Sequence, residues 1–254
     1  MSALLEISKV TVRFGGVVAL DNVSFQVNQG ELLCLIGPNG AGKTTLMRAM
    51  TGIVKPESAG VTLAGRDISH LPTHRRIRLG LALTHQIVRP FRSMTVLDNV
   101  ALAAGYQRVR NVFRAMAALD RTREREKARQ YLERVGIADL ADKNAGVQPL
   151  GVSKRLEMAR ALALEPKVLL LDEPLAGLNQ VEAATLADTV TRINKEGLTV
   201  IMIEHNLGEV LRVSHRLVVL DNGRKIADGL PAEVMRDETV RAAYVGRSKN
   251  DVAA

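Results

Sequence analysis

A glycine-rich stretch at residues 37–45 has the residue types and spacing of a phosphate-binding loop. It reads Gly-Pro-Asn-Gly-Ala-Gly-Lys-Thr-Thr and contains the whole GxxxxGK[ST] pattern. Glycines let backbone N–H groups converge on phosphate oxygens, and a helix beginning near Lys43 directs its positive end toward them. The Lys43 ammonium suits β- and γ-phosphates, and the Thr44 hydroxyl suits Mg²⁺. The predicted nucleotide-binding residues are Asn39, Gly40, Ala41, Gly42, Lys43, Thr44 and Thr45.

An apolar run at residues 168–171 ends in two adjacent acids, Asp172 and Glu173. The run predicts a buried central strand, and that interpretation holds whatever the acids do. Open α/β sheets place their ligands at the carboxyl ends of such strands. At that position Asp172 suits the Mg²⁺ shell, directly or through water. Glu173 suits the water that attacks a γ-phosphate, as its base or as the group that orients it.

The elements that position these residues alternate between strand and helix patterns. Strands are predicted at residues 4–13, 22–27, 31–36, 168–172 and 199–203, and helices at residues 43–50 and 180–195. Residues 61–84 resemble short strands around a helix, with a polar turn at 64–67, and residues 92–163 are helical and charged. The alternation predicts a parallel or mixed sheet with crossover helices.

The predicted fold is an α/β phosphate-loop NTPase core with an N-terminal antiparallel β part and an inserted helical lobe. We assign residues 1–91 and 159–245 to the core and residues 92–158 to the lobe. Residues 246–254 are small and polar, which predicts a flexible tail.

The composition is that of an ordinary globular protein. No apolar run approaches the roughly 20 residues that cross a bilayer, and the N-terminus lacks the basic start and cleavage site of a secretory signal. The one cysteine, Cys34, lies within an apolar strand-like run, which predicts a core residue in a reducing compartment. These features predict a cytoplasmic protein.

The formal charge of +8 raises the question of an anionic partner, and part of the excess is local. Residues 106–134 hold nine Arg and Lys against four acids among helix-forming residues. A solvated helical face is the favoured interpretation, and contact with an anionic membrane surface is the alternative. Because the chain has no Trp and few Tyr or Phe, it offers no aromatic platform for bases, and we predict no nucleic-acid partner.

The motifs, in this order, resemble the nucleotide-binding subunits of ATP-binding cassette (ABC) transporters over nearly the whole chain. The resemblance implies ATP and Mg²⁺ as ligands and makes Lys43 and Glu173 catalytic residues. It also implies an ATPase on the cytoplasmic face of a membrane, joined to transmembrane permease subunits and served indirectly by an extracytoplasmic solute-binding protein.

Three single residues gain a role only from this resemblance. Gln86 stands where the family has a glutamine that senses Mg²⁺ and water and couples to the membrane subunits. His205 follows a short apolar strand, as the family's switch histidine does, and would contact the γ-phosphate. Phe14 lies where the family stacks an aromatic ring on adenine, and a core phenylalanine is the alternative. Without this context Gln86 would be an ordinary surface residue and His205 a structural one.

Other segments are similar to the branched-chain amino acid importers within this family. They are the Arg-Phe-Gly-Gly opening at 13–16, the Ala-Gly-Leu-Asn segment at 176–179, the basic extension, and the ending at 229–234 and 243–246. The resemblance implies uptake of branched-chain amino acids or similar small solutes. Relatives of this branch carry urea, amides or aromatic acids, so the solute stays open.

The family's signature segment, usually Leu-Ser-Gly-Gly-Gln, is degenerate here. Counting back from residues 159–161 places it on residues 148–152, where the usual serine is Pro149 and only Gly151 is retained. This alignment makes Leu150, Gly151 and Val152 the nucleotide contacts. A second alignment onto residues 150–154 restores a leucine and a glycine but breaks the spacing. Because the family works as a head-to-tail pair, we predict a heterodimer with an ATPase subunit that has a better signature.

Two other functions compete with the importer hypothesis. A soluble ABC ATPase acting on nucleic acid or ribosomes would explain the basic charge, but only one ATPase unit is present. A non-enzymatic regulatory partner would explain the degenerate signature, but the catalytic residues elsewhere are complete.

Overall fold

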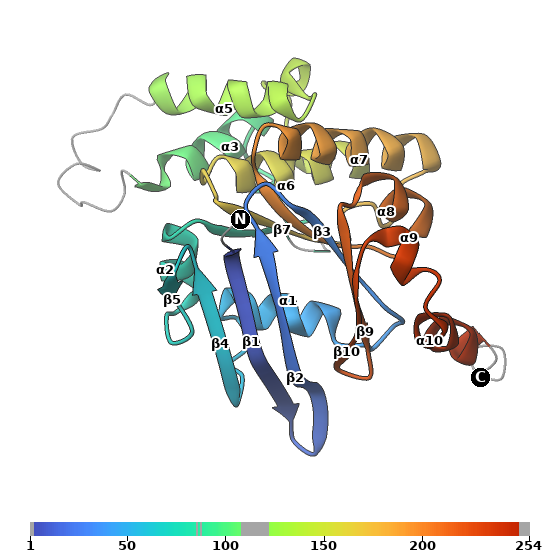
Figure 1. Cartoon of the computed structure of the whole chain (residues 1–254). Helices are drawn as coiled ribbons and strands as arrows, with labels where there is room; N and C mark the ends of the chain where they lie inside the picture. The colour runs from blue at the N-terminus through green and yellow to red at the C-terminus, as the bar shows by residue number, and fades with distance from the viewer. Residues whose placement is uncertain (1–2, 85, 87, 108–121, 249–254) are drawn as a thin grey trace.

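The computed structural model describes residues 3–84, 86, 88–107 and 122–248. They form two sheets and a layer of helices (Figure 1). The first sheet is antiparallel and contains β1 (Ala3–Phe14), β2 (Val17–Asn28), β4 (Ser58–Leu63) and β5 (Arg66–Asp67) in the order β2-β1-β4-β5.

The second sheet is mostly parallel. It contains β3 (Leu32–Ile36), β6 (Leu81–Thr84), β7 (Val168–Asp172), β8 (Thr199–Ile203), β9 (Arg216–Asp221) and β10 (Arg224–Gly229). The strand order is β10-β9-β3-β8-β7-β6, and the edge strand β10 runs antiparallel to β9. The predicted α/β fold with an antiparallel N-terminal part is therefore confirmed.

The described helices connect and cover these strands. They are α1 (Lys43–Thr51), α2 (Thr73–Arg78), α3 (Val96–Ala104), α5 (Thr122–Arg134), α6 (Leu150–Leu162), α7 (Gln180–Lys195), α8 (Leu207–Val213), α9 (Pro231–Val234) and α10 (Glu238–Ser248). Short 3₁₀ helices lie at Gly105–Gln107, Ala138–Leu140 and Ala145–Val147.

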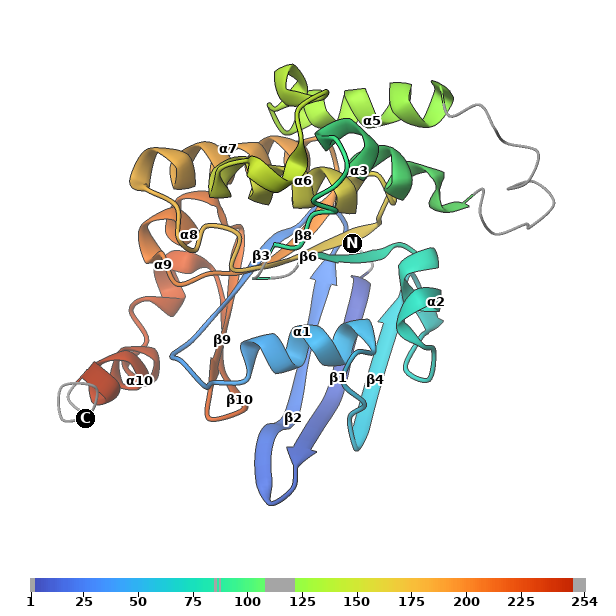
Figure 2. The ribbon, with the colours of Figure 1, turned by 180° about the vertical axis from the view of Figure 1, so that it is seen from behind.

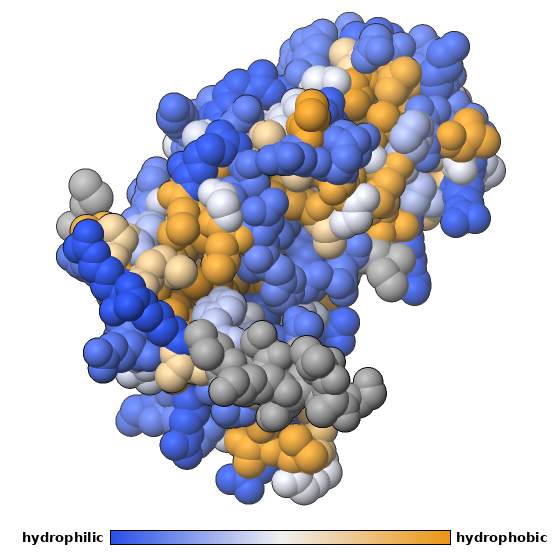
Figure 3. Space-filling view, turned by 90° about the vertical axis from the view of Figure 1, so that its right-hand side faces the viewer, coloured by the Kyte–Doolittle hydropathy of each residue, from blue (hydrophilic) through white to orange (hydrophobic). Residues whose placement is uncertain are grey.

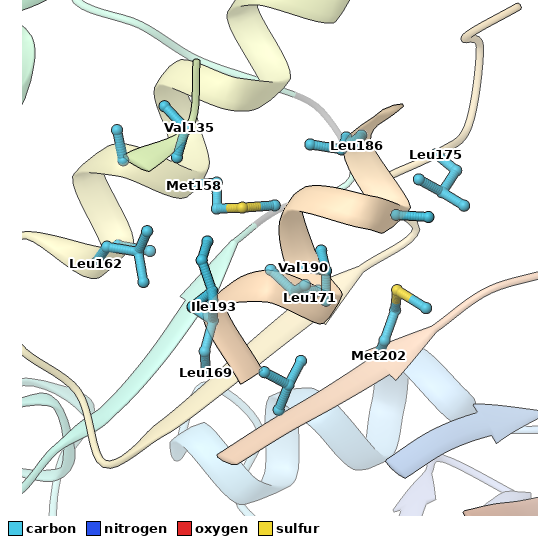
Figure 4. Packing of buried hydrophobic residues seen from close by; sticks show 14 of the residues in the cluster. Val135, Met158, Leu162, Leu169, Leu171, Leu175, Leu186, Val190, Ile193 and Met202 are labelled. Atoms are coloured by element: carbon cyan, nitrogen blue, oxygen red, sulfur yellow. The ribbon is translucent and has the colours of Figure 1, made fainter. Parts of the chain in front are cut away.

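The parallel sheet is buried on both faces. Along β3, Leu33 and Leu35 face one hydrophobic cluster, while Leu32, Cys34 and Ile36 face the other, because successive side chains of a strand point to opposite faces. The first cluster is closed by α1 and the antiparallel sheet, which lie against each other in Figure 2. The second cluster is closed by α6 and α7, whose side chains pack over β7 and β8 (Figure 4).

Cys34 lies in this core, as the sequence predicted. Burial raises the pKa of its thiol, with the nearby Glu204 carboxylate as a second cause in the same direction. The thiol is therefore an apolar core group in the folded protein.

Two predicted boundaries are wrong, and in both cases the turn is tighter than predicted. β2 begins at Val17 rather than at residue 22, because the tight Gly15-Gly16 turn pairs Phe14 directly with Val17. Residues 66–67 form strand β5, since the turn is confined to Ala64 and Gly65, both at positive φ. The helix α10 continues to Ser248 and so overlaps the start of the predicted tail; residues 249–254 lie outside the described residues, and the flexibility of the tail stays a prediction.

The helices α3, α5 and α6 contact one another and lie on one side of the parallel sheet (Figure 1). They fall within the stretch 92–158, apart from the end of α6. The division into a core at 1–91 and 159–245 and a lobe at 92–158 stays a prediction.

No described helix is long and apolar enough to cross a membrane. The face viewed in Figure 3 carries hydrophobic patches separated by hydrophilic side chains.

A buried arginine fixes the end of the helix that follows the phosphate-binding loop. Arg76 of α2 is only 3% exposed. Its guanidinium donates to Ala49 O at 2.9 Å and Met50 O at 2.7 Å in the last turn of α1. Further bonds reach Ser69 O at 2.6 Å and Leu71 O at 2.8 Å. A positive charge near a helix C-terminus also interacts favourably with the negative end of the helix dipole. Arg76 therefore stabilises α1 both by hydrogen bonds and by its charge.

We expect Arg76→Met to lower the free energy of unfolding by roughly 3 kcal/mol, because four buried carbonyl groups lose a charged donor. Urea denaturation followed by circular dichroism measures this loss. The control is Arg75→Met, which removes an exposed arginine from the same helix. Equal stability of the two variants would contradict the assignment.

Candidate functional site

The phosphate-binding loop joins the end of β3 to α1, as the sequence predicted. Gly37 has φ 144° and packs so closely on β9 that a Cβ there would lie 2.0 Å from Leu220 O. Gly42 has φ 100° and would place a Cβ 2.7 Å from Ala19 O of β2. Only glycine fits either position, because the backbone is left-handed and the neighbour is a main-chain atom. Both sheets therefore hold the loop in shape.

The side chains at the end of the loop point inward. Lys43 is buried, and its ammonium donates to Gly37 O at 2.6 Å and Pro38 O at 2.9 Å. Ala41 is buried, whereas Asn39 and Gly40 are exposed at the tip. Thr44 and Thr45 are half-buried in the first turn of α1. A positive charge thus lies inside the loop, where the N-terminus of α1 also points.

The oxygens needed for a magnesium ion lie together. The Thr44 hydroxyl is 3.4 Å from Asp172 Oδ1, at the carboxyl end of β7. Hydroxyl and carboxylate oxygens suit Mg²⁺, which commonly takes one or two protein ligands and completes its shell with phosphate and water. Within the described residues no group of three or more His, Cys, Asp or Glu could hold a metal. The hydroxyl of Thr44 and the carboxylate of Asp172 are a donor set that fits magnesium bound with a nucleotide.

Glu173 lies at the centre of the site, directly after β7. Its Oε1 is 2.7 Å from His205 Nε2, and its Oε2 accepts from Gln86 Nε2 at 2.5 Å. The three residues come from the ends of β7, β8 and β6, which are neighbours in the sheet. The structure thus brings together three residues that lie far apart in the sequence. This contact uses the amide N–H of Gln86, whereas binding of Mg²⁺ would use its amide oxygen. The place of Gln86 in a Mg²⁺ shell stays a prediction.

Phe14 and the signature residues lie outside this cluster. Phe14 is 53% exposed at the end of β1, so it is not a core phenylalanine. Leu150, Gly151 and Val152 form the first turn of α6, with Pro149 at its N-cap. Gly151 faces Glu182, where a Cβ would lie 3.2 Å from Oε1, and Leu150 lies against Gly177. Their contacts are therefore with the segment after Glu173.

Comparison with known proteins places this geometry in a family. Residues 20–176 match the model described as ABC transporter. The chain belongs to the ABC transporter family.

The relatives extend this assignment over the whole chain. The chain is 36% identical to the high-affinity branched-chain amino acid transport ATP-binding protein LivG of Salmonella typhimurium strain LT2, over 96% of this chain and 98% of the relative. BraF of Pseudomonas aeruginosa, of the same description, is also 36% identical over the same shares. The ADP conformation of MJ1267, an ATP-binding cassette of an ABC transporter, superposes with a TM-score of 0.85 at 31% identity, covering 97% of this chain and 100% of MJ1267.

The C-terminal part carries the more specific match. Residues 224–249 match the model described as branched-chain amino acid ATP-binding cassette transporter. This stretch begins at the first residue of β10 and includes α9 and all of α10. The chain is therefore an ABC ATPase whose end is similar to one branch of the family, as the sequence predicted.

Two buried charged residues of this ABC ATPase lie beside Glu173 and His205 but are not among the site residues predicted from the sequence. Glu204 directly precedes His205 and is 3% exposed, and Lys154 of α6 is 6% exposed. Lys154 Nζ donates to the backbone oxygen of Glu173 at 2.9 Å. The sequence does contain a signal for Glu204, since this acid directly follows the apolar strand β8 just as Glu173 directly follows β7. Nothing in the sequence pattern pairs Lys154 with Glu173.

Proposed function

We propose that this chain is the ATP-hydrolysing subunit of an importer that takes up branched-chain amino acids or similar small solutes. It acts through separate transmembrane permease subunits, on the cytoplasmic face of the membrane, with a solute-binding protein on the other side. The observation that carries the proposal is the Glu173 carboxylate held between Gln86 and His205, beside the phosphate-binding loop. The solute class rests on LivG and BraF and on the match of residues 224–249.

The proposed reaction is attack of water on the γ-phosphate of ATP, giving ADP and phosphate. Backbone N–H groups of residues 37–45 and the Lys43 ammonium offset the charge of the β- and γ-phosphates. Glu173 accepts the proton of the attacking water or orients it, and Gln86 and His205 fix the direction of its carboxylate. Thr44 and Asp172 would hold a magnesium ion bound with the nucleotide, and this ion would supply charge neutralisation at the phosphates.

Phe14 is proposed to stack on adenine. Its exposed ring at the end of β1 is free of the core and lies on a hairpin whose second strand touches Gly42 of the phosphate-binding loop. When a base covers an exposed aromatic ring, apolar surface of the ring is buried and dispersion contacts form between ring and base.

The basic helix α5 gives little support to a nucleic-acid function. Arg125 pairs with Asp98 at 2.7 Å and Lys127 with Glu165 at 3.0 Å, and Arg134 pairs with Glu196. Part of the basic charge is thus matched by acids within the chain; residues 108–121 of the basic stretch lie outside the described residues.

Purification from native membranes tests the proposal. The tagged chain, solubilised gently from its host, is expected to bring down two hydrophobic permease subunits and a second ATPase. Permeases without a second ATPase would keep the importer and remove the heterodimer. Ribosomal or DNA-bound partners without a permease would overturn the importer.

The heterodimer rests on Pro149. This residue caps α6 without any side-chain hydrogen bond, and proline has neither a hydroxyl nor an N–H. In a head-to-tail pair, residues 148–152 would face the ATP held by the partner. That site would bind ATP and hydrolyse it slowly, whereas this chain's own loop, Glu173 and His205 would complete the faster site.

We expect Pro149→Ser in the assembled transporter to raise turnover at saturating ATP roughly two- to ten-fold, the worth of one hydrogen bond to phosphate. The steady-state rate of phosphate release measures it. The matched control is Pro166→Ser, because Pro166 lies between α6 and β7 and outside the signature segment. Unchanged or lower turnover in Pro149→Ser would count against the asymmetric pair.

A further inference from the structure

Glu173 has an unusual backbone conformation. Its φ is 50°, in the left-handed region that residues with a Cβ rarely adopt. A conformation of this kind costs on the order of 1 kcal/mol or more and persists only where neighbours hold it. In this chain both polar groups of the residue are held. Its N–H donates to Ile203 O at 3.1 Å, and its C=O accepts from Lys154 Nζ at 2.9 Å.

Lys154 reaches Glu173 from the second turn of α6. The helix is rigidly placed, because Met158 and Leu162 on its later turns pack in the core cluster with Leu169 of β7 and Ile193 of α7 (Figure 4). Burial lowers the pKa of Lys154, while nearby carboxylates, Glu204 first among them, oppose that shift. The ammonium is thus a buried donor surrounded by acids and aimed at a main-chain oxygen.

Glu204 ties the two catalytic loops to each other. Its Oε1 accepts from the N–H of Leu175 at 2.6 Å, in the loop after β7. Its Oε2 accepts from the N–H of His205 at 3.1 Å, in the loop after β8. Burial raises the pKa of this carboxyl, and the N–H groups of Leu175 and His205 lower it. One buried side chain therefore spans the loop that carries Glu173 and the loop that carries His205.

We propose that Lys154 and Glu204 are positioning residues, which together hold the Glu173 carboxylate and the His205 ring in the arrangement used for hydrolysis. Each acts through the backbone beside a catalytic side chain: Lys154 through the C=O of Glu173, and Glu204 through the N–H of His205. Since α6 begins at the signature segment, Lys154 also links that segment to the backbone of the catalytic residue Glu173 in the same chain. The inference rests on the proposed catalytic role of Glu173.

Single variants of this chain, assayed in the assembled transporter, test the proposal because kcat and affinity are measured separately. We expect Lys154→Met to lower kcat for MgATP hydrolysis roughly 10- to 100-fold, with KM and the MgATP dissociation constant within about three-fold of wild type. Glu204→Gln is expected to act in the same direction, because an amide offers one oxygen to the two backbone donors and turns its N–H₂ toward the other donor. Lys154→Arg retains a charged donor and is expected to recover most of kcat.

The controls are Lys127→Met and Glu126→Gln, which make the same chemical changes at exposed positions of α5. The double variant Lys154→Met with Glu204→Gln is expected to lose less than the product of the two single effects, because both side chains support one arrangement. Thermal unfolding of each variant accompanies the kinetics.

Two results would overturn the inference. One is a normal kcat in Lys154→Met and Glu204→Gln while the wild-type chain hydrolyses ATP. The other is an equal loss of kcat and affinity that follows the loss of thermal stability and is not recovered by Lys154→Arg. Absence of hydrolysis by the wild-type transporter would instead count against the proposed function, so the two failures are distinguishable.

Discussion

Glu173→Gln is expected to bind MgATP with wild-type affinity and to hydrolyse it at least ~100-fold more slowly. Glutamine has the size and shape of glutamate and still offers one oxygen to the neighbouring groups. It cannot accept the proton of the attacking water. Its amide also places a donor within the 2.5 Å contact now made with Gln86. Phosphate release at saturating ATP measures the rate, and equilibrium titration with a fluorescent ATP analogue measures the affinity.

The matched control for this prediction is Glu126→Gln, an exposed position on α5. Its rate and affinity are expected to equal those of the wild type. Turnover of Glu173→Gln at the wild-type rate would show that another group activates the water, and would remove Glu173 from the catalytic role.

Lys43→Met is expected to weaken MgATP binding roughly 100-fold, the worth of one or two charge-assisted hydrogen bonds to phosphate. The ammonium lies within 2.6 and 2.9 Å of Gly37 O and Pro38 O, so it already occupies the inside of the loop. A buried methionine of similar length leaves those carbonyls and the bound phosphates without a positive charge. The same fluorescence titration measures the loss.

Lys127→Met serves as the control for Lys43→Met, because it removes an exposed lysine from α5. Binding of MgATP by Lys43→Met at the wild-type strength would mean that backbone N–H groups alone hold the phosphates. Such a result would contradict the placement of the β- and γ-phosphates at Lys43.

Two of the strands that end in the site were predictable to the residue, whereas β6 lies in a stretch predicted only as short strands around a helix. β7 and β8 have the bounds read from the sequence, because each is a short, wholly buried apolar run that stops at a polar residue. The helix α7 also matches, since Asn179 and Glu182 form the capping box that starts it. The antiparallel pair β9 and β10 was not predicted, although the Asn222-Gly223 dipeptide between the two strands is a strong hairpin signal.

The proximity of Glu173, Gln86 and His205 was expected only through the family resemblance. Their sequence positions do not predict distances; those follow from the order β8-β7-β6, which puts three strand ends side by side. Lys154 and Glu204 could not be found in the same way. Their part depends on how far a side chain reaches between α6 and the loops after β7 and β8, which periodicity does not encode.

The exposure of Phe14 settles one alternative that the sequence left open. A phenylalanine in an alternating strand fits a core as well as a surface, and only the position at the end of β1 decides. The domain boundaries and the part played by residues 148–152 stay predictions.

Uptake of labelled leucine tests the central claim most directly. A host strain lacking this chain receives either the wild-type chain or Glu173→Gln at equal membrane abundance, and the initial rate of leucine uptake is measured. The account predicts that the wild type restores uptake and that Glu173→Gln restores none above background. Equal uptake with both would contradict the claim that hydrolysis at Glu173 powers transport.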